Sequence, residues 1–130
     1  MDKLLRRKVD AYLMDWKNKP DRKPLIIKGA RQIGKTRSVE WFASQNYTSV
    51  ISINFVEQTK YREIFSDGFE VDVILKNISL LNPGVRFIPG DTLFFFDELQ
   101  ACPNCATSLK FFKLDGRFDV ICSGSLMGIN

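Results

Sequence analysis

Residues 29–36 read Gly-Ala-Arg-Gln-Ile-Gly-Lys-Thr and match the pattern G-x-x-x-x-G-K-[ST], the Walker A phosphate-binding loop. Glycine lets the backbone pass close to an anion. The backbone N–H groups, together with the N-terminus of the helix that follows, supply partial positive charge. Lys35 adds a full charge for the β- and γ-phosphates, and the hydroxyl of Thr36 can bind Mg²⁺. This segment therefore predicts a binding site for the phosphates of a nucleotide.

The predicted nucleotide-binding residues run from the first glycine of the loop into the following helix. They are Gly29, Ala30, Arg31, Gln32, Ile33, Gly34, Lys35, Thr36 and Arg37. We expect only the backbone N–H groups of Arg31 and Gln32 to bind phosphate, which leaves their side chains for solvent or a partner.

A second candidate element is the apolar run at residues 93–96, which is followed by Asp97 and Glu98 and looks like a Walker B motif. A buried strand would deliver Asp97 to the phosphate end of a sheet, where it can hold Mg²⁺ through water, opposite Thr36. Glu98 can polarise the water that attacks the γ-phosphate while Lys35 stabilises charge. Many strands end in acidic residues, but this pair follows a Walker A loop, and the second acid favours ATP hydrolysis over GTP hydrolysis. We therefore predict Glu98 and Lys35 as catalytic residues, Thr36 and Asp97 as ligands of Mg²⁺, and ATP as the substrate.

Two serines, Ser123 and Ser125, follow the next apolar run. One of their hydroxyls could bind the γ-phosphate or the attacking water, as a sensor residue does. The alternative is an ordinary Ser/Gly turn. The sequence does not distinguish Ser123 from Ser125.

Cys102 and Cys105 form a C-x-x-C pair, a pattern that can bind zinc or perform thiol redox chemistry. A tetrahedral zinc site needs four ligands, yet the chain has no histidine and only one further cysteine, Cys122. We interpret all three as small, partly buried thiols in a reducing compartment.

Apolar residues follow helical and strand spacing in alternating segments. Helices are expected at residues 2–17, 36 to about 45, 58–66, 70–81 and 103–114, and strands at 23–28, 48–55, 92–96 and 118–123. This alternation predicts an α/β fold, the three-layer parallel-sheet core of P-loop NTPases, preceded by an amphipathic helix. Ligands of such sheets bind beyond the carboxyl ends of the strands, and all three candidate elements fall there.

The composition, 45% hydrophobic and 26% charged, is typical of a soluble globular protein. No apolar stretch approaches the ~20 residues of a membrane span, and the N-terminus lacks the apolar region of a signal peptide. We therefore expect a cytoplasmic protein without a membrane partner. The net charge of +4 could favour polyanions, but ATP is itself one, so nucleic-acid binding is only a weaker alternative.

Four segments in combination resemble the N-terminal part of bacterial and archaeal AAA-type ATPases whose loop reads G-A-R-Q-x-G-K-T. They are residues 29–36, Phe-Phe-Asp-Glu-Leu-Gln at 95–100, Ser-Leu-Lys-Phe-Phe at 108–112 and Cys-Ser-Gly-Ser-Leu-Met-Gly at 122–128. The resemblance covers essentially the whole chain. It implies an ATPase with an additional strand and a catalytic glutamate, with Lys35 and Thr36 in the loop, Asp97 and Glu98 as the acidic pair, and Ser123 or Ser125 as the sensor-like residue.

Such ATPases are usually several hundred residues long and continue with a fifth strand, a helical lid with further arginines and a C-terminal domain. The resemblance therefore implies that residues 1–130 are a single P-loop core domain, with an N-terminal helix and linker at 1–22, from the N-terminal part of a longer protein. The fifth strand would then be missing beside the strand at 23–28. We expect the chain by itself to bind ATP weakly and to hydrolyse it slowly or not at all.

The leading hypothesis is ATP binding and, in the full-length protein, Mg²⁺-dependent hydrolysis coupled to a task that the sequence does not reveal. One alternative is an interaction module in which ATP is a switch that sets contacts with a protein partner or with further copies of the chain. The other is a nucleic-acid-associated ATPase, which only basic residues such as Arg6, Arg7 and Lys8 suggest.

Overall fold

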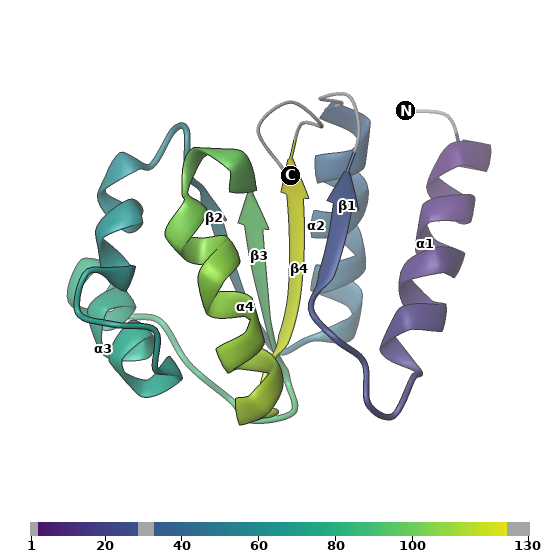
Figure 1. The fold of residues 1–130 in the computed structure, drawn as a ribbon. Helices are drawn as coiled ribbons and strands as arrows, with labels where there is room; N and C mark the ends of the chain where they lie inside the picture. Colours follow the sequence, from purple (N-terminus) through teal and green to yellow (C-terminus); the bar gives the residue numbers. More distant parts are fainter. Residues whose placement is uncertain (1–2, 29–32, 125–130) are drawn as a thin grey trace.

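The computed structural model describes residues 3–28 and 33–124, which form an all-parallel sheet with helices on both faces (Figure 1). The strands are β1 (Leu25–Lys28), β2 (Ser49–Asn54), β3 (Thr92–Asp97) and β4 (Asp119–Gly124). The α-helices are α1 (Lys3–Lys17), α2 (Ile33–Asn46), α3 (Val71–Leu81) and α4 (Pro103–Asp115), and the 3₁₀ helices are η1 (Thr59–Phe65) and η2 (Leu99–Ala101). The strand order is β1-β4-β3-β2. The predicted α/β class with a parallel sheet between helices is confirmed.

The central position of β3 explains why residues 93–96 read as an unbroken apolar run. A strand that is covered on both faces is hydrophobic throughout, because each side chain meets one helical layer or the other. Phe94 and Phe96 pack in the cluster that contains α3 and α4, whereas Leu93 and Phe95 pack in the cluster that contains α1 and α2. All four side chains are at most 1% exposed. The run therefore holds Asp97 at a fixed place at the end of β3.

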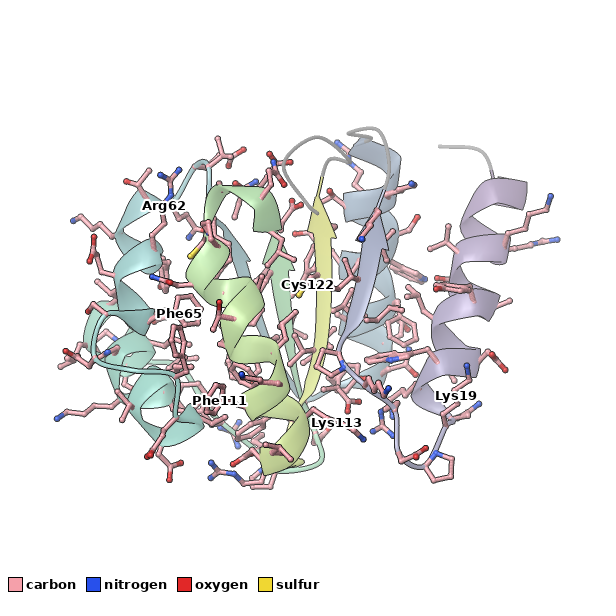
Figure 2. All side chains as sticks on the ribbon, viewed as in Figure 1. Lys19, Arg62, Phe65, Phe111, Lys113 and Cys122 are labelled. Atoms are coloured by element: carbon pink, nitrogen blue, oxygen red, sulfur yellow. The ribbon has the colours of Figure 1, made fainter. Side chains whose placement is uncertain are left out.

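Aromatic rings fill the layer between the sheet and α4. The ring of Phe94 lies 5.3 Å from that of Phe112, 5.5 Å from that of Phe118 and 5.8 Å from that of Phe96, measured between centroids. Phe65 of η1, which Figure 2 shows beside the same layer, lies 6.4 Å from Phe96. Burying each ring contributes roughly 2–3 kcal/mol of hydrophobic stabilisation, so this layer is a main source of stability.

The opposite layer joins the N-terminal helix to the domain. Leu13 and Trp16 on the apolar stripe of α1 are buried against Phe42 and Ala43 of α2. The indole N–H of Trp16 donates a hydrogen bond of 2.8 Å to the backbone carbonyl of Lys23. The amphipathic helix is thus packed into the core rather than extending away from it, and its last turn fastens the linker that leads into β1.

The structure corrects the expected limits of several elements. α2 begins at Ile33 rather than near residue 36. β1 begins at Leu25, directly after Pro24, because proline has no backbone N–H for a strand ladder. The stretch expected to be helical at 58–66 is a 3₁₀ helix, and η2 was not predicted. The other limits agree with the expected ones to within about two residues, which is the usual uncertainty of helix and strand ends.

β1 and β2 are the two edges of the sheet in the part of the chain that the structure describes. Ile26 of β1 is 37% exposed, in contrast to the fully covered residues of β3 and β4. This edge is where the expected fifth strand would pair. Separately, none of the helices within 3–28 and 33–124 combines the length and apolarity that crossing a membrane requires.

Candidate functional site

The candidate site lies at the carboxyl edge of the sheet, which is the upper edge in Figure 1. Because every strand pair is parallel, all four strands end at this edge. In register, Asn54 of β2 stands beside Asp97 of β3, and Lys28 of β1 stands beside Gly124 of β4. α2 begins at the same edge. The topology therefore brings together segments that lie far apart in the sequence.

Lys35 and Thr36 lie in the first turn of α2 and are half-buried. The first four N–H groups of an α-helix have no acceptor within the helix, and the helix macrodipole places partial positive charge at this end. The first turn of α2 contains no acidic side chain that would offset this charge. The start of α2 thus offers both backbone donors and the ammonium group of Lys35 to an anion.

Asp97 is the point at which three parts of the fold meet. Its Oδ1 accepts a hydrogen bond of 2.5 Å from the hydroxyl of Ser123 on β4 and one of 2.9 Å from the backbone N–H of Glu98. Its Oδ2 accepts a longer bond of 3.5 Å from the hydroxyl of Thr36 on α2. These three donors fix the orientation of the carboxylate at the end of β3.

The two strand-end serines are separated by the structure. Ser123 is buried, with 9% of its surface exposed, and it contacts Asp97. Ser125 lies outside the described residues. The contact with Asp97 gives Ser123 a definite place in the candidate site, which the sequence could not assign.

Of the Walker A residues, too, the structure describes some and not others. Gly29, Ala30, Arg31 and Gln32 lie outside the described residues. Ile33 and Gly34 form the start of α2, followed by Lys35 and Thr36, and Arg37 is exposed on the same helix.

Glu98 has an unusual backbone conformation. Its φ and ψ of 60° and 49° are left-handed, and among the described residues it is the one non-glycine with positive φ. This conformation costs a side-chain-bearing residue roughly 1–2 kcal/mol. Its side chain is nonetheless buried, at 7% exposure, and Oε2 accepts a hydrogen bond of 3.1 Å from the amide nitrogen Nε2 of Gln100. Strain of this kind is characteristic of functional sites, where packing maintains it.

Gln100 was not among the residues predicted from the sequence. It is half-buried in η2, two residues after Glu98. The available signal was a polar side chain close behind the acidic pair, but only the left-handed turn at Glu98 brings the two side chains together.

The oxygen atoms at this edge fit a magnesium ion. Mg²⁺ prefers hard oxygen ligands, and in nucleotide sites it binds one or two carboxylates or hydroxyls, with phosphate and water completing its shell. The Thr36 hydroxyl and the Asp97 carboxylate provide such a pair, 3.5 Å apart. Within 3–28 and 33–124 there is no group of three or more His, Cys, Asp or Glu side chains that could hold a metal ion. A magnesium ion held by this pair would need phosphate and water to complete its shell.

The three cysteines lie in the core cluster that contains α4. Cys102 and Cys105 are at the start of α4, and Cys122 is on β4 (Figure 2). All three are buried free thiols. Burial raises the pKa of each thiol, and it raises the pKa of Cys105 and Cys122 further than that of Cys102. The reactive thiolate form is therefore disfavoured, and the thiols pack as small apolar groups.

Comparison with known proteins agrees with this arrangement. A family model described as an AAA domain matches residues 21–129. The match begins in the linker before β1 and includes both the Walker A segment and the acidic pair at the end of β3. A search of curated proteins finds no match.

Proposed function

Because the chain belongs to the AAA domain family, we propose that it binds Mg-ATP at the carboxyl edge of its sheet and hydrolyses the bond to the γ-phosphate, slowly when the chain is by itself. The observation that carries this proposal is the set of contacts around Asp97. Its carboxylate accepts hydrogen bonds from Thr36 at 3.5 Å and from Ser123 at 2.5 Å. These contacts join the end of the Walker A segment, the end of β3 and the end of β4 at one place.

In this proposal the start of α2 binds the phosphates. The backbone N–H groups of the Walker A segment surround the phosphate oxygens, and the ammonium group of Lys35 neutralises charge on the β- and γ-phosphates. The first turn of α2 itself contributes no acidic side chain that would offset this charge.

Thr36 and Asp97 would hold the magnesium ion with their hydroxyl and carboxylate oxygens. When bound, Mg²⁺ neutralises charge that develops on the transferring phosphoryl group. Ser123 keeps the Asp97 carboxylate in place through its hydroxyl, and the backbone N–H of Glu98 does the same directly after β3. In this proposal the carboxylate that binds the metal is already oriented before nucleotide arrives.

Glu98 would act on the attacking water. Its carboxylate accepts a hydrogen bond from the water and makes the oxygen more nucleophilic as the bond to the γ-phosphate breaks. Water adds to phosphorus, the β–γ bridging oxygen leaves with ADP, and inorganic phosphate is the second product. In this proposal Glu98, as the neighbour of Asp97, acts near the γ-phosphate of a nucleotide whose phosphates lie at the start of α2.

Isothermal titration of the chain with ATP, in the presence and absence of Mg²⁺, tests the binding site. We expect Lys35→Ala to weaken ATP binding by about 10- to 100-fold, as loss of a charged hydrogen-bond donor does. Lys76→Ala is the matched control, because Lys76 is an exposed lysine on α3, and it should bind like the wild type. Equal affinities of the wild type and Lys35→Ala would rule out this site.

Hydrolysis is tested separately with Glu98→Gln, which keeps the size of the side chain but removes its charge. Loss of a general base lowers the rate by about 10²-fold or more, so we expect ATP binding to persist while release of phosphate falls by this factor. A variant that hydrolyses ATP at the wild-type rate would contradict the catalytic role. If Glu98→Gln preserves ATP-dependent association with a partner or with further copies of the chain, ATP acts as a switch rather than as a source of energy.

A further inference from the structure

A tight turn connects β3 to α4 and carries both Glu98 and Gln100. The backbone carbonyl of Glu98 accepts a hydrogen bond of 3.0 Å from the N–H of Ala101, and the carbonyl of Leu99 accepts one of 3.0 Å from the N–H of Cys102. Leu99, at 2% exposure, anchors the turn in the core under α4. The backbone of this turn is therefore held both by its own hydrogen bonds and by packing.

The left-handed conformation at Glu98 determines where its side chain goes. At φ 60° and ψ 49° the chain reverses direction directly after Asp97, and the Glu98 side chain lies back against the turn with 7% of its surface exposed. There its Oε2 accepts the hydrogen bond of 3.1 Å from Nε2 of Gln100. A buried carboxylate needs hydrogen-bond donors to offset the loss of water, and the Gln100 amide provides one.

An amide is well suited to this position for a chemical reason. Lysine or arginine at this position would form an ion pair with Glu98. Its positive charge would neutralise the carboxylate and make it a weaker hydrogen-bond acceptor for the attacking water. The glutamine amide carries no net charge at any accessible pH, yet its N–H groups donate in a defined direction. It can therefore orient the carboxylate without neutralising it.

We propose that Gln100 is a positioning residue for Glu98, whose carboxylate it holds in the orientation from which Glu98 polarises the attacking water. This inference rests on the proposed hydrolysis and deepens it by naming the residue that sets the geometry of its base. Gln100 acts through Glu98 and takes no part in binding the nucleotide. The left-handed backbone conformation of Glu98 is maintained at this place because it brings the Gln100 amide within hydrogen-bond distance of the Glu98 carboxylate.

The first test is Gln100→Leu, which keeps a side chain of similar size and removes the donor. Hydrolysis is followed as phosphate release with ATP in excess over the chain, in incubations long enough for a slow rate to be measured. We expect kcat to fall about tenfold, as loss of one hydrogen bond to a charged group predicts, with KM for ATP changed less than about twofold. Gln45→Leu, the same substitution at an exposed position of α2, should leave both constants unchanged.

The second test is a double-mutant cycle that separates positioning from a merely structural role. If Gln100 acts through the Glu98 carboxylate, Gln100→Leu should have no further effect on the residual rate of Glu98→Gln. If Gln100 only stabilises the turn, the same factor of about ten should be lost in both backgrounds. Thermal unfolding of all four proteins shows whether any of the substitutions disturbs the fold.

A third measurement examines the contact without relying on activity. In an NMR spectrum of the ¹⁵N-labelled chain, the side-chain amide signals of Gln100 should move when Glu98 is replaced by alanine, whereas those of Gln45 should stay in place. Unmoved Gln100 signals would contradict the contact. An unchanged or increased kcat in Gln100→Leu would overturn the positioning role, and an increase would mean that Gln100 restrains Glu98.

The outcomes distinguish this inference from the function on which it rests. If the wild-type chain releases phosphate no faster than Lys35→Ala, the proposed hydrolysis fails, and the positioning role fails with it. If the wild type hydrolyses ATP and Glu98→Gln does not, but Gln100→Leu matches the wild type, only the role of Gln100 fails.

Discussion

The carboxylate of Asp97 receives hydrogen bonds from a hydroxyl on α2, a hydroxyl on β4 and the backbone of its own neighbour. None of these three donors carries a charge. They therefore fix the orientation of the carboxylate without neutralising its negative charge. A cation that reaches this edge therefore meets a carboxylate whose position is already set. The role of Asp97 in binding magnesium can therefore be tested by a substitution that keeps the size of its side chain.

We expect Asp97→Asn to abolish the strengthening of ATP binding by Mg²⁺. The neutral amide is a poor ligand for Mg²⁺. Its NH₂ group would also face hydroxyl donors on one side. Titration with ATP should then give the same affinity with and without Mg²⁺, whereas Mg²⁺ should strengthen binding to the wild type by about tenfold or more, the gain from a single ionic hydrogen-bonded contact.

Asp15→Asn is the matched control for this experiment. The side chain of Asp15 is 77% exposed on α1 and forms only a long surface contact with Lys19, so the control should keep the full Mg²⁺ effect. An Asp97→Asn variant that still responds to Mg²⁺ by the wild-type factor would remove Asp97 from the metal site.

At the scale of the elements, the ends of helices and strands decide which side chains reach the site. α2 starts within the Walker A motif, so Lys35 and Thr36 sit in its first turn. At the amino edge of the sheet, α4 ends at Asp115 and is capped by Gly116. The φ of Gly116 is 74°, which is left-handed, and its N–H donates a hydrogen bond to the carbonyl of Phe112. Stopping α4 there allows β4 to begin at Asp119 and to carry Ser123 to the carboxyl edge in register with β3.

Gly116→Ala tests how much this helix end contributes to stability. A methyl group at this position would meet no other atom within 4 Å, so the cost is one of backbone conformation alone. We expect a loss of roughly 1–2 kcal/mol in the free energy of unfolding, measured by denaturation with urea. Gly84→Ala is the control: its φ lies outside the positive range, its nearest atom would be 3.9 Å away, and its effect should stay within about 0.5 kcal/mol. Equal effects of the two substitutions would contradict this account.

For the whole molecule, the two edges of the sheet have different contents. The carboxyl edge gathers the candidate site, whereas the amino edge holds a charged network that closes the fold. There the Asp119 carboxylate accepts two hydrogen bonds of 2.9 Å from the guanidinium of Arg22 and one of 2.6 Å from the hydroxyl of Tyr47. This network ties the linker before β1 and the end of α2 to the start of β4. It fixes the domain on the side opposite to the candidate site.

The amino-edge network predicts a dependence of stability on alkaline pH. Burial, and secondly the hydrogen bond to Asp119, raise the pKa of Tyr47 above its usual value of 10.0. A raised pKa contributes stability that is fully present below about pH 10, where the unfolded chain also keeps its proton. That stability is lost as the pH rises further, because the unfolded chain then ionises while the folded one does not.

Tyr47→Phe removes both the hydrogen bond and this titration. At neutral pH we expect the variant to be less stable than the wild type by roughly 1–3 kcal/mol, the value of a hydrogen bond to a charged group. Above about pH 10 the difference should narrow, because only the wild type loses the contribution of Tyr47. Urea denaturation of both proteins at about pH 7 and about pH 11 measures the difference in their free energies of unfolding at each pH. A difference that stays constant or widens would show that Tyr47 is not protected from ionisation.

Much of the fold was predictable because its signals are local. The alternation of helical and strand spacing and the continuous apolar run before Asp97 are properties of neighbouring residues. They predicted a parallel α/β sheet and the edge at which its polar residues gather. Strand and helix limits were less certain, as at the start of α2 and in η1, because the last turn of an element depends on what packs against it.

Residue types and their spacing predicted the kind of site: a Walker A segment, an acidic pair after a buried strand and a serine after the next strand. Which atoms meet could be seen only in the folded chain. That Ser123 contacts Asp97, and that Glu98 adopts a left-handed turn within reach of Gln100, depends on the register of β3 with β4 and on the packing of Leu99 in the core. The reason is physical: a motif is a property of neighbours along the chain, whereas hydrogen bonds among distant residues form only after the sheet and its helices have packed.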